Sequence, residues 1–258
     1  MTNPVLIQQH EDILEIAINR PEAYNALNLE VFEMLSDTLV TVATDNSVKG
    51  IMLTGKGKAF CSGGDLKWVS QQTEDAGATF YRLAPQFHIA ITEIRSMGKP
   101  VVAAINGIAA GGGFSLALAC DFRVMAESAV LRQAYTSIGL SIDGGGSFAL
   151  PRLVGMARAL EIAAFDPPIS SNQALVWGLV TKVVPDDKLF ETTLSMLQGL
   201  AKSALHSFAW SKRLLTESLN NNLETQLELE HQGISECARH LNGQEGLKAF
   251  VEKRKPVF

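Results

Sequence analysis

The sequence predicts an α/β fold in which short buried strands alternate with amphipathic helices. Three observations support this prediction. The apolar run at residues 50–55 is bounded by glycines, which is typical of a buried strand. Residues 28–43 and 76–96 carry apolar side chains at helical spacing. After Pro151 only residues 179–184 have a strand pattern, so the last third of the chain is expected to be helical.

Composition fits one large globular unit. The chain has 258 residues, of which 47% are hydrophobic and 19% charged. A chain of this length buries roughly three quarters of its unfolded surface without help from a disulfide or a metal. Cys61, Cys120 and Cys237 are widely spaced and form no zinc pattern with the histidines. We therefore expect no metal site and a reduced setting, either cytoplasmic or an organelle matrix.

The charge balance argues against nucleic-acid and membrane partners. The net charge of −5 provides no basic field for either partner. Residues 1–12 lack the basic flank and long apolar stretch of a signal peptide. Residues 101–120 contain no charge and are long enough to span a membrane, but Asn106 and several glycines interrupt them. We expect a buried strand, a turn and a buried helix there.

In chain order, residues 5–20 predict two strands joined at 10–12, and Arg20–Pro21 predicts a turn. Asn28 is placed to cap the first helix. The helix at 76–96 is followed by further predicted elements, namely strands at 101–105, 121–125 and 129–133 and a helix at 114–119. Later helices are expected near 156–164, 171–177, 187–202, 207–220, 222–240 and 243–252. The predicted division is an α/β core over 1–195 and a C-terminal helical region over 196–258.

Two glycine-rich turns, at residues 61–65 and 110–114, are candidate sites for an oxyanion. Free N–H groups at a helix N-terminus favour a carbonyl oxygen that becomes negative during reaction. Two such amides from different loops would form an oxyanion hole. Alternatively, these glycines only allow tight packing between strand and helix. Neither turn has the pattern of a dinucleotide or phosphate loop.

Asp143 lies alone in the apolar segment 138–150 and precedes three glycines. Desolvation is expected to raise the pKa of such a carboxyl toward the range of a general acid or base. Asp143 could also cap the helix that follows, and the two roles are compatible. His88 on the second helix and Tyr135 are each candidates for the site or for ordinary packing. The basic run 253–255 is a solvated end or a phosphate contact.

Six segments in order resemble the crotonase superfamily, the enoyl-CoA hydratase/isomerase group. They are RPEAYNALN at 20–28, GKAFCSGGDL at 57–66, KPVVAAINGIAAGGGFSLALACDFRV at 99–124, LPRLVGMARALE at 150–161, ALVWGLVTKVV at 174–184 and FVEKRKPVF at 250–258. The resemblance implies a crotonase-like spiral of ββα units with a C-terminal helical trimerisation region, assembled as a homotrimer or hexamer. It also implies acyl-CoA thioester substrates, with coenzyme A as part of the substrate and no separate cofactor.

Carried over by position, the resemblance places the oxyanion amides on Gly64 and Gly112. It also implies contacts to the acyl-CoA from two loop segments and the C-terminal helix, with His88 and Tyr135 near the acyl group. The loop and helix residues are Ala23, Tyr24, Ala26, Gly64, Asp65, Leu66, Lys67, Phe250 and Lys253. Where many relatives carry a basic residue, this chain has Glu22, so phosphate pairing is not expected there.

The departures from the family pattern favour isomerase chemistry. At the positions of the two hydratase glutamates the chain has Ser115 and Tyr135, which cannot serve as carboxylate acids or bases. Asp143 remains as the acid, and an acid in this loop is similar to the isomerase branch, which includes double-bond and ring-epoxide isomerases. The sequence therefore predicts an enoyl-CoA double-bond isomerase that uses Asp143, Gly64 and Gly112.

Three alternatives stay open at this point. Asp143 and His88 also resemble the nucleophile and base of a hydrolytic aryl-CoA dehalogenase, although Ile89 stands where a second aromatic residue is expected. The chain could instead be a hydratase that uses unusual residues. It could also be a non-catalytic acyl-CoA binder or an RNA-binding relative, and the acidic balance argues against the last of these.

Overall fold

A six-stranded sheet forms the centre of the protein in the computed structural model, which describes residues 3–258. Its order is β1-β2-β3-β5-β7-β10, with β1 and β2 antiparallel and the other neighbours parallel. The strands are β1 (Val5–His10), β2 (Ile13–Ile18), β3 (Gly50–Gly55), β5 (Val101–Ile105), β7 (Phe122–Ala126) and β10 (Lys182–Val184). The predicted α/β fold class is confirmed.

A second sheet of short strands lies against the first and has the order β4-β6-β8-β9. Its strands are β4 (Ala59–Cys61), β6 (Ile108–Ala110), β8 (Val130–Arg132) and β9 (Ile169–Ser170). Each of the strands β3, β5 and β7 leads into one short strand of this sheet and then into a helix or helical turn. This repetition is the predicted spiral of ββα units.

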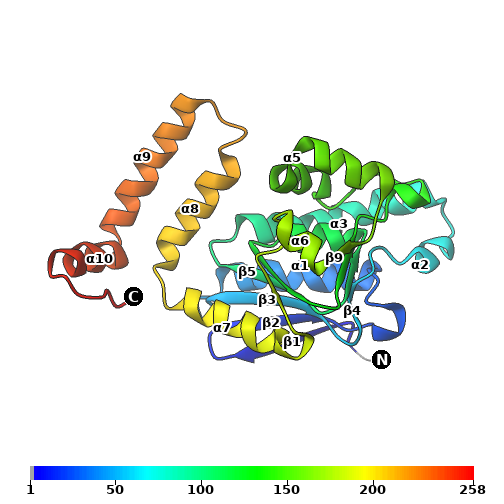
Figure 1. Cartoon of the computed structure of the whole chain (residues 1–258), viewed down its shortest axis with the longest axis horizontal. Helices are drawn as coiled ribbons and strands as arrows, with labels where there is room; N and C mark the ends of the chain where they lie inside the picture. The colour runs from blue at the N-terminus through cyan, green and yellow to red at the C-terminus, as the bar shows by residue number, and fades with distance from the viewer. Residues whose placement is uncertain (1–2) are drawn as a thin grey trace.

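Ten α-helices surround and extend these sheets within residues 3–258 (Figure 1). They are α1 (Leu29–Thr44), α2 (Leu66–Ser70), α3 (Ala76–Ser96), α4 (Gly112–Ala119), α5 (Gly146–Phe165), α6 (Ser171–Val176), α7 (Leu189–Ala201), α8 (Leu205–Glu217), α9 (Leu223–Arg239) and α10 (Leu241–Val251). Short 3-10 turns are η1 (Pro21–Ala23), η2 (Thr136–Ile138) and η3 (Asp186–Lys188). The predicted cap is confirmed, because the Asn28 side chain accepts from the Val31 N–H at 3.1 Å.

The structure differs from the sequence-based expectation at short strands and at α5. Strands β4, β6 and β9 have only two or three residues, too few for a hydrophobic period to be recognised. The helix predicted over 156–164 is the second half of α5, which begins at Gly146. Gly155 interrupts it with φ 75° and ψ 161°, so the periodic pattern covers only the part after this kink.

The uncharged run 101–120 forms β5, β6 and the buried helix α4. The expected strand, turn and helix are thus confirmed, with one additional short strand. Nowhere in residues 3–258 does a helix combine the length and the apolar character needed to cross a membrane.

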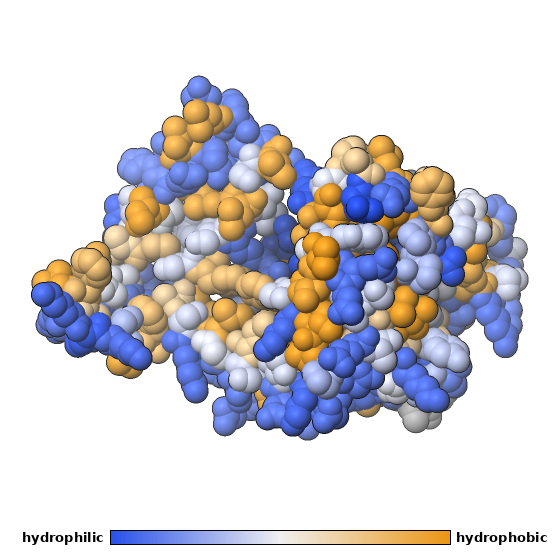
Figure 2. Space-filling view, viewed as in Figure 1, coloured by the Kyte–Doolittle hydropathy of each residue, from blue (hydrophilic) through white to orange (hydrophobic). Residues whose placement is uncertain are grey.

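Helices α8 to α10 extend from the core as an arm, which Figure 1 shows at the end of the molecule opposite α2. The boundary predicted at 195/196 falls inside α7, whose residues pack on the central sheet. Lys212 of α8 joins the arm to the core through an ion pair with Asp121 at 2.8 Å. Large apolar side chains are exposed on the arm and on α5 and α6, and Figure 2 shows them gathered over these elements.

Candidate active site

The two glycine-rich turns meet at the N-terminus of α4. An ideal Cβ on Gly63 would lie 2.9 Å from the Ala110 carbonyl oxygen, and one on Gly113 would lie 2.1 Å from the Cys61 carbonyl oxygen. Side chains larger than hydrogen would therefore separate the two turns. At this junction the glycines of both turns allow direct contact between the two backbones.

Gly64 and Gly112 lie close together, and the Gly64 nitrogen is 3.7 Å from the position of an ideal Cβ on Gly112. Gly112 is the first residue of α4, so its N–H has no acceptor inside the helix. The Leu27 N–H donates to the Gly63 carbonyl at 2.8 Å, and the Leu27 carbonyl accepts from the Asp65 N–H at 2.9 Å. Neither of these hydrogen bonds uses the Gly64 N–H. Both glycines line the same pocket. The oxyanion hole expected from these two amides stays a prediction.

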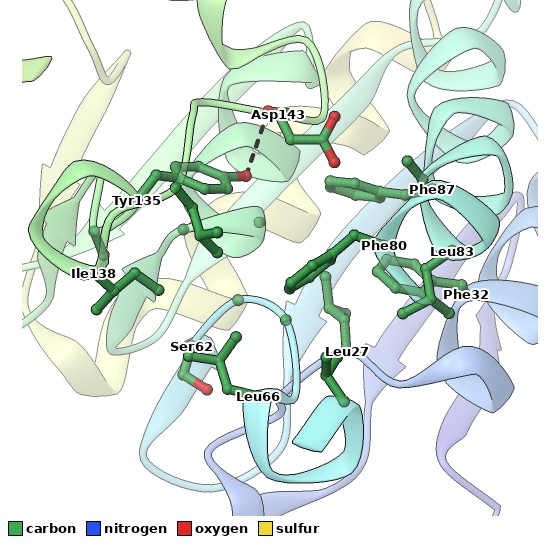
Figure 3. A pocket seen from close by; sticks show the side chains of 18 residues that line it. Leu27, Phe32, Ser62, Leu66, Phe80, Leu83, Phe87, Tyr135, Ile138 and Asp143 are labelled. Atoms are coloured by element: carbon green, nitrogen blue, oxygen red, sulfur yellow. Dashed lines mark hydrogen bonds between the residues drawn. The ribbon is translucent and has the colours of Figure 1, made fainter. Parts of the chain in front are cut away.

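The pocket beside these amides has a volume of about 250 Å³ and is mainly apolar (Figure 3). Its apolar side chains come from the segment before α1, from α1, α2 and α3, and from the segment around η2, and are Leu27, Phe32, Leu66, Val69, Phe80, Leu83, Ala84, Phe87, Ala134, Ile138 and Leu140. Within residues 3–258, Asp143 is the only carboxylate that lines it. A thioester carbonyl bound to the two amides would place its acyl group in an apolar space that contains one acid.

Asp143 and His88 come together at the pocket rim. The imidazole Nε2 of His88 lies 2.7 Å from the carboxylate Oδ1 of Asp143. Their side chains are 51% and 43% exposed in the single chain, so the expected burial of Asp143 is wrong. Its expected role as a helix cap is also wrong, because the N-cap of α5 is Gly145, without a side-chain hydrogen bond. The loop turns Asp143 outward from the apolar segment toward α3, where His88 projects.

Ser115 and Tyr135 also face Asp143, but through its main chain. The Ser115 hydroxyl donates to the Asp143 carbonyl oxygen at 2.6 Å, and the Tyr135 hydroxyl lies 3.4 Å from the same oxygen. Burial is the main cause that raises the pKa of the Tyr135 phenol far above its ordinary value. The phenol therefore stays protonated, in agreement with its exclusion as an acid or base near neutral pH.

The first two segments predicted to contact coenzyme A lie side by side. Arg20 connects them, donating to the Ala26 carbonyl at 2.6 Å and to Asp65 Oδ2 at 2.9 Å. The Ser62 N–H donates to the Tyr24 carbonyl at 3.0 Å. Ala23 ends η1, Tyr24 is exposed, and Asp65 caps α2, which contains Leu66 and Lys67. Arg20 was not singled out from the sequence, although it belongs to the same motif as Tyr24.

Phe250 and Lys253 are not brought to this pocket within one chain. Phe250 lies on α10 and is exposed, and Lys253 follows the end of that helix. In Figure 1, α10 lies at the far end of the arm from α2. The neighbouring Arg254 is engaged by Glu245 at 2.6 Å and by Glu252 at 2.7 Å. Their predicted contact with the nucleotide stays a prediction.

The aromatic pocket walls were not recognised from the sequence. Phe80 and Phe87 have helical spacing on one face of α3, and helical spacing alone does not separate a core face from a pocket wall. Phe32 of α1 packs against Phe87 with ring centroids 5.1 Å apart.

As to metals, residues 3–258 contain no group of three or more His, Cys, Asp or Glu side chains placed to hold an ion.

Comparison with known proteins identifies the family. The family model described as enoyl-CoA hydratase/isomerase matches residues 8–258. The chain is 33% identical over 258 residues to a 1,2-epoxyphenylacetyl-CoA isomerase of Escherichia coli strain K12, covering 98% of this chain and 97% of the relative. It is 38% identical over 248 residues to a probable enoyl-CoA hydratase of Rhodobacter capsulatus, covering 96% and 95%.

Solved structures agree with the fold. An enoyl-CoA hydratase from Bacillus anthracis superposes with a TM-score of 0.92 at 33% identity, covering 99% of this chain and 98% of the other. One from Polaromonas sp. JS666 gives 0.92 at 35% identity, with 98% of both chains covered. The chain belongs to the enoyl-CoA hydratase/isomerase family, and its crotonase-like fold is confirmed.

Proposed function

We propose that this protein is an enoyl-CoA isomerase that moves a double bond along the acyl group of an acyl-CoA thioester. The N–H groups of Gly64 and Gly112 bind the thioester oxygen and stabilise the enolate. The Asp143 carboxylate removes a proton from C2 of a 3-enoyl group and returns it at C4, which gives the conjugated 2-enoyl group. No cofactor is needed beyond the coenzyme A of the substrate.

One observation carries this proposal. Among the described residues that line the pocket, Asp143 is the only carboxylate, and it shares the pocket with both glycine amides. Addition of water across a double bond by the family's hydratases uses two glutamates, and the residues here, Ser115 and Tyr135, are hydroxyls directed at the Asp143 main chain. A single carboxylate is sufficient for a proton transfer between two carbons.

The experiment is to incubate the protein with 3-enoyl-CoA and 2-enoyl-CoA thioesters, including aromatic ones, and to follow mass and absorbance. Isomerisation leaves the mass unchanged and produces the absorbance of a conjugated thioester from the 3-enoyl compound. The same equilibrium mixture is expected from either side. A gain of one water would contradict the proposal and support a hydratase. Binding without any turnover would support an acyl-CoA binder.

Hydrolytic dehalogenation of an aryl-CoA is the second candidate, and the 2.7 Å contact between His88 and Asp143 favours it. The carboxylate would attack the ring carbon and expel halide, which leaves an aryl ester on the aspartate. His88 would take a proton from water, and attack of that water on the ester carbonyl would release the phenol and the free carboxylate. Halide release from 4-chlorobenzoyl-CoA would support this reaction in place of isomerisation.

A homotrimer or hexamer is proposed for the assembly, supported by the apolar side chains exposed on the arm, such as Leu241, Leu247 and Phe250. Contiguous exposed apolar surface marks a site of association. Light scattering coupled to size-exclusion chromatography tests this. A monomer at micromolar concentration would contradict it.

A further inference from the structure

The hydroxyl groups of Ser115 and Tyr135 both lie near the main-chain carbonyl oxygen of Asp143. The Ser115 Oγ lies 2.6 Å from the Asp143 carbonyl oxygen, and the Tyr135 hydroxyl lies 3.4 Å from it (Figure 3 draws the second contact). The two hydroxyl oxygens lie 3.2 Å apart. Three residues from α4, from the segment before η2 and from the loop before α5 thus form one small network.

The direction of the hydrogen bonds follows from the groups present. A carbonyl oxygen only accepts, so the Ser115 proton is donated to Asp143. The Ser115 oxygen is then free to accept from Tyr135, whose buried phenol retains its proton. The chain of donors runs from Tyr135 to Ser115 to the Asp143 carbonyl, and successive hydrogen bonds of this kind strengthen one another. Ser115 is 1% exposed and Tyr135 9%, so water does not compete with them.

The backbone on the C-terminal side of Asp143 is also packed closely against α3 and α4. An ideal Cβ on Gly144, where φ is 60°, would lie 2.1 Å from the Phe87 ring. One on Gly146 would lie 2.5 Å from the Ser115 hydroxyl. The Gly146 N–H donates to the Asp143 carbonyl at 3.1 Å. The loop thus has little room to shift relative to the two helices that flank the pocket.

We propose that Ser115 and Tyr135 are positioning residues for Asp143, and that they fix its main chain so that its carboxylate meets the acyl group. This inference rests on the proposed isomerase function of the same site. The side-chain carboxylate of Asp143 is in contact with the imidazole of His88. Ser115 and Tyr135 stand where the hydratases carry their two glutamates. In this protein they would position Asp143, the acid–base group of the proposed isomerisation. Loss of either hydroxyl leaves the carboxylate present but less well aligned.

The test compares Ser115→Ala and Tyr135→Phe with Ser171→Ala as a matched control. Ser171 is also buried, and its hydroxyl donates to the main-chain carbonyl of Glu127 at 2.8 Å, away from the pocket. Misalignment of a reacting group by about 1 Å can cost about 100-fold in rate, so we expect Ser115→Ala to lower kcat by about 10- to 100-fold with KM nearly unchanged. Tyr135→Phe should lower kcat less, because the Tyr135 hydroxyl donates to Ser115 and reaches the Asp143 carbonyl only through it.

A second measurement does not depend on turnover. Hydrogen–deuterium exchange of residues 140–149 reports how firmly the loop is held, and Ser115→Ala should accelerate exchange there while Ser171→Ala should not. The inference is overturned if Ser115→Ala retains kcat within about twofold, if Ser171→Ala loses as much, or if loop exchange is unchanged. If the wild type fails to isomerise any thioester but Ser115→Ala still loosens the loop, the proposed function fails and the positioning of Asp143 stands.

Discussion

The His88 imidazole lies 2.7 Å from the Asp143 carboxylate, although the two residues are 55 positions apart in the chain. His88 lies on α3 directly after Phe87, and Phe87 lines the pocket. Asp143 comes from the loop that leads into α5. The contact joins the only carboxylate of the described pocket lining to an imidazole, the side chain that most often serves as a general acid or base.

Replacement of His88 by Gln separates the two candidate reactions. In an isomerase the Asp143 carboxylate moves the proton itself, so His88→Gln should lower kcat by no more than about 10-fold. In a dehalogenase the same change removes the base that activates water, and an aryl ester on Asp143 should accumulate. Intact-protein mass spectrometry after addition of 4-chlorobenzoyl-CoA detects that ester.

Asp143→Asn should strongly slow isomerisation while the fold persists. A general base contributes typically about 10²- to 10⁴-fold, and we expect kcat to fall within that range with little change in KM. The pair with His88 is half exposed, and exposed ion pairs contribute about 0–1 kcal/mol to stability, so the melting temperature should change little. Asp143→Asn with full turnover would show that another group is the base.

The sequence predicts the fold well because its long elements have clear periods and boundaries. The helices beginning at Leu29 and Ala76 show this, and the first is capped by Asn28 as predicted. The candidate site was predicted in part. Gly64 and Gly112 follow from motifs, but the exposure of Asp143 depends on how the loop turns relative to α3, which no local pattern specifies. Contacts with the carbonyl of Asp143 depend on segments distant in sequence.

A methyl group at Gly64 should impair the site without disturbing the fold. An ideal Cβ there has only the Phe80 ring near it, at 4.0 Å, so the backbone tolerates alanine. The methyl would lie in the pocket beside the amide that we propose to bind the thioester oxygen. Loss of a whole oxyanion donor costs about 100- to 1,000-fold, so we expect Gly64→Ala to reduce kcat/KM by about 10-fold or more.

Gly199→Ala is the control for that experiment. Gly199 lies in α7 with no atom within 4 Å of its ideal Cβ, and alanine is favoured over glycine in a helix by about 1 kcal/mol. We expect higher stability and unchanged kinetics. If Gly64→Ala retained full kcat/KM and a normal melting temperature, the amide of Gly64 would not bind the reacting oxygen.

Glu15 should make part of the stability depend on acid pH. Burial opposes ionisation of Glu15, but hydrogen bonds from Lys56 at 2.6 Å and His10 at 2.9 Å outweigh it and lower its pKa below the ordinary 4.5. A carboxyl with a lowered folded-state pKa stabilises the protein above its unfolded-state pKa, and this contribution disappears as pH falls through the folded-state pKa. Glu15→Gln should thus destabilise at pH 7, and the difference from wild type should shrink in acid. Glu22→Gln, at an exposed position, should have no such effect in urea unfolding at the same pH values.

Lys212 should be required for the attachment of the arm to the core. Its ammonium lies 2.8 Å from Asp121 Oδ2 and 2.7 Å from the Ile94 carbonyl, with both side chains of the ion pair less than 10% exposed. Burial lowers the pKa of Lys212 and raises that of Asp121, because it disfavours the charged form of each group. The attraction and the hydrogen bond between the two groups oppose this desolvation cost. Lys212→Met leaves a buried carboxylate without its partner and should cost about 3–5 kcal/mol of unfolding free energy.

The double variant Asp121→Asn/Lys212→Met distinguishes a lost charge partner from lost packing. It removes both charges and keeps an acceptor for the Val101 N–H, which donates to Asp121 at 2.9 Å. We therefore expect it to unfold at higher urea concentration than Lys212→Met alone, because no uncompensated charge remains in the interior. Equal loss in the single and double variants would mean that the ammonium acts through its bonds to main-chain carbonyls rather than through Asp121.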